Sequence, residues 1–285
     1  MGLPKNVALT VDLEEWTVAE DYGRERVPGA VKLNVARQGL YRILKILATQ
    51  KVKATFFVTA YFAENNERIL RNMLEAGHEI GNHGLRHARR IPLNLKQETE
   101  AIQESTKIIK SVTGRKPCGY REPYLAITTN TITALMRTGY AYDSSILGTW
   151  LPRKSKWLQV PSTPFVWKTR NNGNLLELPL STLAKLRIPA GWWWLRKNLG
   201  NPIPLASANL LFQKAHPFIM NVHTWELAEP PPNLTIPLHI RHNCGHQSAR
   251  QIINLIAALK SYGAQFTLMK TVAKAFQSTQ LVTYI

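Results

Sequence analysis

Short apolar runs with β-strand character alternate with helical patterns along most of the chain. Val7–Val11 is continuous in apolar and β-branched side chains, and Lys53–Thr59 repeats the pattern. Strands that are buried on both faces of a parallel sheet carry such runs. Gln38–Ala48 spaces its apolar residues as one face of a helix does. The alternation predicts a parallel α/β sheet, and over 285 residues it predicts a closed or nearly closed barrel.

The same rhythm continues beyond these first elements. Further strands are expected at His78–Gly81, Cys118–Tyr120, Leu175–Pro179, Phe218–Val222 and Gln265–Met269. Further helices are expected at Glu67–Ala76, Leu95–Val112, Thr129–Thr138, Ser248–Ser261 and Thr271–Phe276. Gly77, Gly114 and Gly139 follow three of these helices as C-terminal caps, and Ser248 with Gln251 forms a capping-box pattern.

One stretch, Trp150–Gln213, breaks the rhythm because it is rich in proline, tryptophan and arginine. We interpret residues 150–213 as an irregular insertion or cap on the barrel. No linker divides the chain, so residues 1–285 are expected to form a single domain.

The charge balance is strongly basic, with 36 Lys and Arg against 18 Asp and Glu and a formal net charge of +18. Such a field attracts nucleic acid, an anionic membrane surface or a phosphorylated substrate. The cations are dispersed and no nucleic-acid-binding motif is present, so we do not expect nucleic acid. Two cysteines, no secretory leader and no apolar stretch of spanning length predict a cytoplasmic protein, or one peripheral on the inner membrane face.

Polar residues follow the predicted strands at equivalent places. In α/β barrels the loops after the strand C-termini carry the catalytic groups. The clusters are Asp12 to Glu15, Asn82 to His87, Arg121 to Tyr124, Asp143 to Ser145, and His223 to Glu226. We expect their side chains to meet at one end of the barrel.

His83 and His87 are four residues apart, which on a helical turn puts both imidazoles on one face. Two imidazoles and a carboxylate make an open site for a divalent metal such as zinc. Asp12 and Glu14 share a face if the strand continues, so one can bind the metal while the other takes a proton from water. The alternatives to a metal site are a chance pair of surface histidines and an acidic loop exposed to solvent.

His223 is a candidate general acid for a leaving amine, or else a buried structural histidine. Asp143 could orient it or tune its pKa. Arg121 could bind the catalytic carboxylate or a substrate phosphate.

Taken together, the clusters resemble the motifs of the polysaccharide deacetylase family, with its NodB homology domain (carbohydrate esterase family 4). The resemblance runs from Val7 to Phe276 and looks closest to the branch found beside exopolysaccharide gene clusters. It rests on ALTVDLEEW, ATFFVTAYFAEN, GHEIGNHGLRH, GYREPY, YDSSI and NVHTWEL. It implies a distorted (β/α)7 barrel.

The resemblance also implies roles for individual residues. The matches are Asp12 as base, His83 and His87 as metal ligands, Arg121 steadying the base, the Tyr124 backbone N–H as oxyanion donor, and His223 as acid with Asp143 as its partner. The usual Asp-Asp pair is Asp12-Leu13 here, so we assign the acidic ligand to Glu14 on strand geometry, with Glu15 as runner-up. The implied cofactor is a divalent metal, zinc being the first choice.

The implied activity is metal-dependent hydrolysis of an N-acyl group, acetyl in the first instance, from an amino sugar of a polysaccharide or a lipid-linked glycan. Expected substrate contacts are Pro123, Trp193, Trp225 and His242. The alternatives are an amidohydrolase or deformylase acting on a small amide or formamido sugar, and an inactive glycan-binding homologue.

Two further clusters allow two interpretations each. Trp192, Trp193 and Trp194 stand beside Arg187, Arg196 and Lys197, a composition that suits a membrane interface or an aromatic cap over a sugar groove. The set of His239, His242, Cys244 and His246 could bind a second metal, although a loop that contacts the substrate fits its spacing better.

Overall fold

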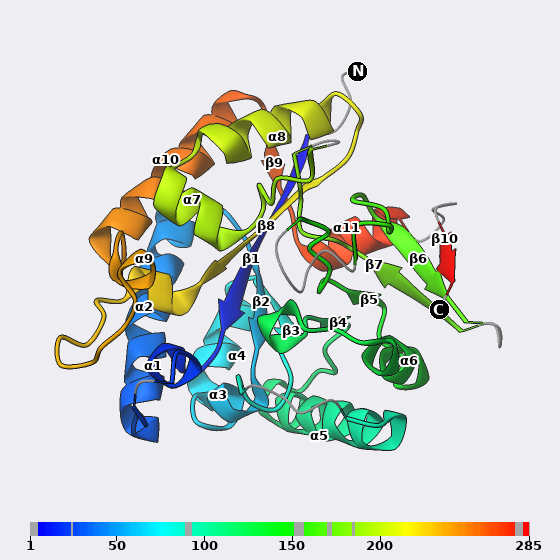
Figure 1. Cartoon of the computed structure of the whole chain (residues 1–285), viewed down its shortest axis with the longest axis horizontal. Helices are drawn as coiled ribbons and strands as arrows, with labels where there is room; N and C mark the ends of the chain where they lie inside the picture. Colours follow the sequence, from blue (N-terminus) through cyan, green and yellow to red (C-terminus); the bar gives the residue numbers. More distant parts are fainter. Residues whose placement is uncertain are drawn as a thin grey trace.

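The computed structural model describes residues 5–23, 25–88, 93–150, 157–169, 173–183, 186–276 and 282–284 (Figure 1). The strands are β1 Asn6–Leu13, β2 Thr55–Val58, β3 Glu79–Asn82, β4 Gly119–Tyr120, β5 Tyr142–Asp143, β6 Phe165–Lys168, β7 Asn174–Glu177, β8 Phe218–His223, β9 Gln265–Phe266 and β10 Val282–Tyr284. The α-helices are α1 Val18–Asp21, α2 Gly29–Thr49, α3 Ala60–Glu64, α4 Glu67–Glu75, α5 Leu95–Thr113, α6 Thr129–Arg137, α7 Trp193–Leu199, α8 Pro202–Phe212, α9 Leu238–Arg241, α10 His246–Ser261 and α11 Met269–Phe276. Two 3-10 turns, η1 Pro123–Leu125 and η4 Thr224–Leu227, follow β4 and β8.

The described strands belong to one mixed sheet in the order β10-β6-β7-β5-β4-β3-β2-β1-β8, with β9 pairing to the start of β1. From β7 to β8 the neighbours are parallel, and they form the seven-stranded wall that was predicted. Only the β6–β7 pair is antiparallel among these ladders. The sheet curls, with helices covering its outside (Figure 1). The predicted distorted (β/α)7 barrel is confirmed, in the form of an open, curled sheet.

The barrel opens between β7 and β8, where connecting chain replaces a strand ladder. Leu180 donates its N–H to the carbonyl oxygen of Ile146 at 3.0 Å, and Ser181 donates to Ile219 at 2.9 Å. Asn221 of β8 in turn donates to the carbonyl oxygen of Gly191 at 2.9 Å. A Cβ at Gly191 would lie 2.2 Å from the carbonyl oxygen of Ile219, so only glycine allows this approach. The approach brings α7 against the C-terminal end of β8.

Local sequence signals explain several helix boundaries. Gly77, Gly114 and Gly139 adopt positive φ angles of 85°, 72° and 69° directly after α4, α5 and near the end of α6, as predicted. The expected start of α10 was wrong. The helix begins at His246 without a side-chain cap, and Ser248 is buried inside its first turn.

The stretch 150–213 is more regular than the sequence suggested, within the part of it that is described. It contains β6, β7, α7 and α8, and β7 is a strand of the barrel wall. Its prolines do not prevent helix formation, because Pro202 occupies the first turn of α8, where no backbone N–H is needed. Residues 151–156, 170–172 and 184–185 of this stretch lie outside the described residues.

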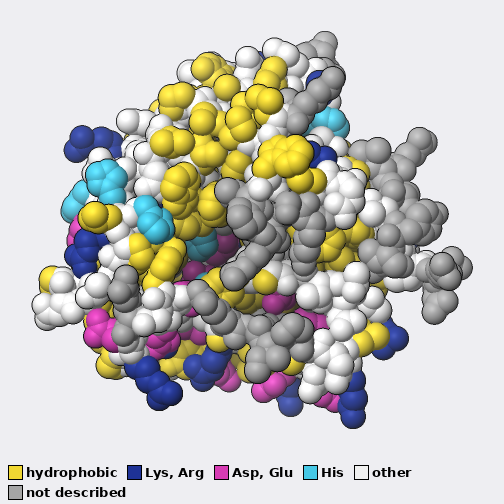
Figure 2. Space-filling view, viewed as in Figure 1, with side chains coloured by type: hydrophobic (Ala, Val, Ile, Leu, Met, Phe, Trp, Pro, Cys, Tyr) yellow, Lys and Arg dark blue, Asp and Glu magenta, His cyan; other side chains and the backbone are white. Residues whose placement is uncertain are grey.

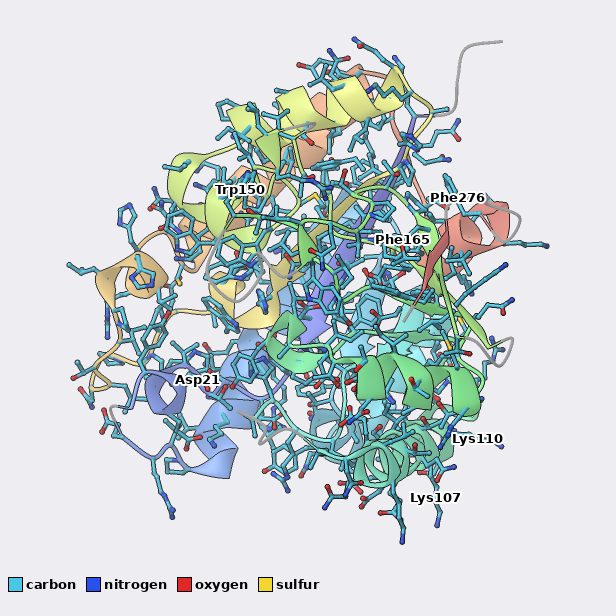
Figure 3. All side chains as sticks on the ribbon, turned by 45° about the vertical axis from the view of Figure 1, so that its right-hand side comes forward. Asp21, Lys107, Lys110, Trp150, Phe165 and Phe276 are labelled. Carbon is cyan, nitrogen blue, oxygen red and sulfur yellow. The ribbon has the colours of Figure 1, made fainter. Side chains whose placement is uncertain are left out.

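The largest apolar cluster lies between the sheet and the helices α2, α8 and α10. Charged side chains stay outside it. Lys107 and Lys110 of α5, for example, point away from the sheet (Figure 3). Among the described residues, the structure contains no helix with the length and apolar character needed to cross a bilayer.

Candidate metal centre and active site

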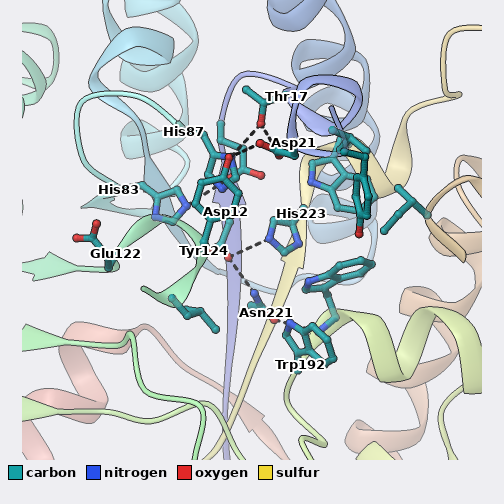
Figure 4. A pocket seen from close by; sticks show the side chains of 17 residues that line it. Asp12, Thr17, Asp21, His83, His87, Glu122, Tyr124, Trp192, Asn221 and His223 are labelled. Atoms are coloured by element: carbon teal, nitrogen blue, oxygen red, sulfur yellow. Dashed lines mark hydrogen bonds and ion pairs between the residues drawn. The ribbon is translucent and has the colours of Figure 1, made fainter. Parts of the chain in front are cut away.

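A pocket of about 290 Å³ opens at the C-terminal ends of β1, β3 and β8 (Figure 4). Its lining includes acidic and imidazole side chains from four of the five predicted clusters. It also includes three tryptophans, Trp192, Trp193 and Trp225. These four strand-end clusters therefore converge as expected, whereas Asp143 to Ser145 do not line the pocket.

Glu14, His83 and His87 meet at the floor of this pocket. The Oε2 atom of Glu14 lies 3.1 Å from Nε2 of His83 and 3.0 Å from Nε2 of His87. All three side chains are buried, and their ligand atoms lie within 4.8 Å of one another. No other group of three such donors comes so close among the residues that the structure describes.

The two histidines do not lie on a helical turn. The chain bends between them at Gly84, whose φ is +78°, and their ring centroids are 5.7 Å apart. A loop thus produces the convergence that we had predicted from helix periodicity.

Hydrogen bonds to the other ring nitrogens orient both imidazoles. Nδ1 of His83 lies 2.7 Å from the carbonyl oxygen of Arg121, which accepts its proton. Nδ1 of His87 lies 3.1 Å from the hydroxyl oxygen of Thr17, which itself donates to Asp21 at 2.9 Å. Each Nε2 is therefore left with its lone pair toward Glu14, the tautomer that a metal ligand requires.

Glu15 faces away from this group. Its carboxylate accepts the hydroxyl of Thr59 at 2.8 Å and the backbone N–H of His87 at 3.0 Å. Glu15 therefore fixes the loop that carries His87, and Glu14 is the acid that meets the histidines.

The electrostatics of the three donors suit a cation. Burial raises the pKa of Glu14 despite its contact with His83. Burial, followed by the charge of His83, holds the pKa of His87 well below its ordinary value. Burial acts to lower the pKa of His83, but the hydrogen bond to Glu14 and the charge of Asp12 raise it. The two imidazoles and the carboxylate match the N and O donor set of zinc and similar ions.

Asp12 lies beside this centre at the end of β1. Its Oδ1 accepts from Nη1 of Arg121 at 2.7 Å, and its Oδ2 accepts from Nδ2 of Asn221 at 2.9 Å. Burial acts to raise the pKa of Asp12, but Arg121 and then His223 and His83 outweigh it and hold the pKa below its usual range. Asp12 is therefore an ionised acceptor.

Arg121 is fully buried and has a partner on each nitrogen. Besides Asp12, its guanidinium donates to the hydroxyl of Thr10 and to the carbonyl and hydroxyl oxygens of Ser144, all at 2.7–2.8 Å. It also lies over the ring of Phe57 at 4.2 Å. The predicted contact between Arg121 and the carboxylate is present.

His223 faces Asp12 across the pocket, with 3.5 Å between its Nε2 and Oδ2 of Asp12. Its carboxylate partner is Glu226, not the predicted Asp143. Glu226 Oε1 lies 3.3 Å from Nδ1 of His223 and accepts the His223 backbone N–H at 2.6 Å. Glu226 also pairs with the buried Arg196 of α7.

Burial acts to lower the pKa of His223, but the hydrogen bond to Glu226 and the charges of Glu14 and Asp12 raise it above its ordinary value. The imidazole therefore tends to hold a proton. Sequence reasoning missed the roles of Glu226 and Arg196. The spacing of Glu226 three residues after His223, at the turn after a strand, was the available signal.

Asp143 belongs to a different buried pair. In the parallel register of β5 and β7, Asp143 is the direct partner of Glu177. Its carboxylate accepts the hydroxyl and backbone N–H of Ser145 at 2.7 and 3.0 Å. Burial raises the pKa of both acids, and for Glu177 the charge of Asp143 adds to the shift. Strand register thus directs Asp143 toward β7 and away from His223.

Tyr124 lies in η1 with a positive φ of 56°, and its ring centroid is 4.0 Å from that of His87. Its hydroxyl donates to Oδ1 of Asp21 at 2.5 Å, and burial followed by the charge of Asp21 raises its pKa. Pro123 is buried, and it is not among the residues that line the pocket. The oxyanion role of the Tyr124 backbone N–H stays a prediction.

The aromatic wall of the pocket is built around His223. Trp193 meets the His223 ring edge to face at 5.3 Å, and Trp225 lies at the same distance on another side. The predicted positions of Trp193 and Trp225 at the site are therefore observed. Trp192, which also lines the pocket, was not predicted as a contact residue.

His242 lies elsewhere. It is exposed, does not line this pocket, and its carbonyl oxygen accepts from the buried ammonium of Lys197. The structure does not place the predicted substrate contact in the pocket, because His242 follows the end of α9 as its C-terminal cap and is exposed to solvent. The neighbouring Cys244 donates to the carbonyl oxygen of Ile240 at 3.1 Å. The described part of the chain therefore provides no second metal centre from His239, His242, Cys244 and His246.

In sequence, the chain is similar to known proteins over about half of its length. The family model described as polysaccharide deacetylase matches residues 5–142, just under half of the sequence. A peptidoglycan deacetylase of Helicobacter pylori is 31% identical over 128 residues, which is 44% of each chain. The match thus covers less than half of that relative's length.

Solved structures extend the likeness to the whole fold. A protein of Mycobacterium smegmatis, described provisionally as a polysaccharide deacetylase, superposes with a TM-score of 0.74 at 19% identity, covering 99% of this chain and 93% of that one. PuuE allantoinase superposes with a TM-score of 0.70 at 18% identity, covering 98% and 92%. At these identities the likeness concerns the fold.

Proposed function

We propose that this chain, whose residues 5–142 match the polysaccharide deacetylase family model, is a metal-dependent hydrolase that removes an N-acyl group from an amino sugar. The observation that carries this proposal is the meeting of Glu14, His83 and His87 beside Asp12 and His223 in one pocket. The acyl group proposed is acetyl, and the sugar is part of a polysaccharide or a lipid-linked glycan.

Glu14, His83 and His87 would hold the cation, and the carboxylate and imidazole donors favour zinc. When bound there, a divalent cation supplies Lewis acidity that lowers the pKa of water and polarises the amide carbonyl. Arg121 and Thr17 fix the two imidazoles through Nδ1, so the donors are arranged before the cation arrives.

Asp12 and His223 divide the proton transfers. Asp12, which Arg121 keeps ionised, accepts the proton of the attacking water. His223, which Glu226 helps to keep protonated, donates its proton to the amide nitrogen as the carbon–nitrogen bond breaks. The Tyr124 backbone N–H is the expected donor to the developing oxyanion. A carboxylic acid and a free amino sugar result.

The pocket fits one sugar residue better than a large ligand. Its volume is about 290 Å³, at the lower end of small-molecule sites. Trp192, Trp193 and Trp225 offer apolar ring faces beside the proton donor, the kind of surface on which sugar rings pack. A cytoplasmic location remains part of the proposal, and subcellular fractionation tests it.

The test combines elemental analysis of the purified protein with release of acetate from N-acetylglucosamine oligomers. His83→Ala and His87→Ala should lose the metal and the activity, whereas His242→Ala, an exposed histidine outside the pocket, should keep both. Release of formate from a formamido sugar, without acetate release, would identify a deformylase instead. A metal-free wild type that releases neither acid would identify a non-catalytic glycan-binding protein and end the proposal.

A further inference from the structure

Helices α7 and α8 present an apolar surface to solvent. Leu199, at the end of α7, is 60% exposed, and Leu210 of α8 is 41% exposed. Trp194 and Ile203 are half-buried on the same pair of helices. We call these four side chains the α7–α8 face. In the view of Figure 2, apolar side chains gather over these helices, above the hollow of the pocket.

Helix α8 is predominantly apolar and contains no ionisable side chain; of its two polar residues, Ser207 is buried and Asn209 is exposed. In a water-soluble protein the apolar side chains of such a helix are normally covered. One side of α8 packs on β8 and α10, whereas Leu210 and its neighbours remain uncovered within the described part of the chain. An apolar surface of this kind marks an interaction site.

A second apolar pair adjoins this surface. Trp150, labelled in Figure 3, is 70% exposed and donates its indole N–H to the carbonyl oxygen of Leu186, which is 64% exposed. Thr182, four residues before Leu186, is tied to α8, because the hydroxyl of Ser207 donates to its carbonyl oxygen at 3.3 Å. The exposed leucine thus follows closely in sequence on a residue that contacts α8.

The charges around the surface are positive. Between Glu177 and Glu226 the sequence contains no aspartate or glutamate. Arg196 and Lys197 of α7 are buried and are bound to groups inside the protein, so they do not contribute. Lys214 after α8 and Arg250 on the adjacent α10 are exposed.

The surface is continuous with the pocket through two tryptophans. Trp192 lines the pocket and stacks on Trp194, with 6.0 Å between ring centroids and 20° between ring planes. An aromatic path therefore leads from the catalytic groups to the outside of α7.

We propose that the α7–α8 face docks on the interface of an anionic bilayer, with the pocket opening beside the headgroups. Indole rings and leucine side chains partition into this interface, while Lys214 and Arg250 meet anionic headgroups. Of the cations beside the tryptophans, Arg196 and Lys197 take no part in this docking, because both are buried. If the proposed hydrolase function holds, docking would favour the lipid-linked form of the glycan.

A second copy of the chain fits this surface less well. In a two-fold interface the same patch faces itself, which would bring the cations of both copies together without any acid from this segment. Anionic lipid instead offers the complementary charge.

The test is flotation of the purified protein with vesicles of equimolar phosphatidylcholine and phosphatidylglycerol at physiological salt. A double variant, Leu199→Glu with Leu210→Glu, should lower the partition coefficient at least about tenfold, because it puts two charges into the docked surface. The matched control is Tyr262→Glu. Tyr262 is 44% exposed at the barrel end opposite the pocket, where its carbonyl oxygen accepts from Lys5.

The proposal is supported if wild type and Tyr262→Glu float, the double variant does not, and all three unfold at the same temperature. It is overturned if wild type stays with the unbound protein, or if the double variant floats as well as wild type. Light scattering that shows a wild-type dimer, made monomeric by the double variant, would assign the surface to self-association. Flotation needs no turnover, so a protein that does not float could still be a hydrolase. In the same way, a protein that releases no carboxylic acid could still dock on the membrane.

Discussion

Glu226→Gln tests whether the general acid is controlled by a carboxylate that the family resemblance did not suggest. Glu226 Oε1 lies 3.3 Å from Nδ1 of His223, and both side chains are largely buried. At an effective dielectric constant of about 20, opposite charges at this distance attract by about 5 kcal/mol before the cost of burial is deducted. Glutamine keeps the shape and the backbone contact but removes this charge.

The expected effect on activity follows from the sign of the pKa shift. The acid works when His223 is protonated, so the rate falls as pH rises through its pKa. Glu226 helps to raise that pKa, and its loss moves the alkaline limb of the pH–rate profile to lower pH. Above that limb the variant should lose up to about 10²–10⁴-fold in rate, the usual contribution of general acid catalysis.

Stability must be separated from this effect, because Glu226→Gln also leaves Arg196 without its ion pair. Breaking a buried pair on one side costs about 3–5 kcal/mol. Arg196→Met should cost a similar amount but leave the Glu226 carboxylate beside His223. The double variant should be less destabilised than the sum of the single variants, because no charge is then left unpaired.

The assay is a double-mutant cycle read in two ways, by urea denaturation and by kcat against pH on the metal-loaded enzyme. Both variants that lack Glu226 should show the displaced alkaline limb, whereas Arg196→Met should keep the wild-type limb. An unmoved limb in Glu226→Gln would refute the role assigned to Glu226 and leave it a purely structural partner of Arg196.

Two further predictions concern the neighbouring acids. Glu14→Gln should abolish metal binding in elemental analysis, whereas Glu15→Gln should keep the metal and lose about 1–3 kcal/mol of stability, because Thr59 and the His87 N–H lose a charged acceptor. If the Glu15→Gln protein contained no metal, Glu15 would be the acidic ligand and Glu14 the residue with the structural role. Glu177→Gln should flatten the fall in stability as pH rises above 4.5, the ordinary pKa of the group, because the folded state holds a proton there that the unfolded chain releases. Urea midpoints at several pH values measure this, and an unchanged slope would argue against a proton held by Glu177 in the folded state.

The sequence predicted the parts of the site that depend on strand ends. Asp12, His83 and Arg121 follow predicted strands, and the C-terminal ends of parallel strands meet at one edge of a sheet. Their convergence therefore needs only the order of the elements. Alternation along the strand gave Glu14 as the acidic ligand, although β1 ends one residue earlier, at Leu13.

The errors have a common cause in contacts between distant segments. The partner of Asp143 depends on the register of β5 against β7, and a short strand carries no pattern that fixes register. Arg196 and Lys197 look like surface cations next to tryptophan. Their burial requires Glu226 and the carbonyl groups of α9, which lie well beyond them in the chain.

The open seam between β7 and β8 connects the catalytic groups with the outer surface. A strand in that gap would close the barrel and occupy the place where Gly191 and Asn221 meet. The gap instead admits α7, which turns Arg196 inward to Glu226 and leaves Trp194 on the outside. Because Arg196 also contacts Gln251 of α10, α7 is held in place on its inner side. The same short helix can therefore pair with the Glu226 carboxylate on its inner side and present a docking surface on its outer side, and substitutions on the outer side should leave the inner contacts intact.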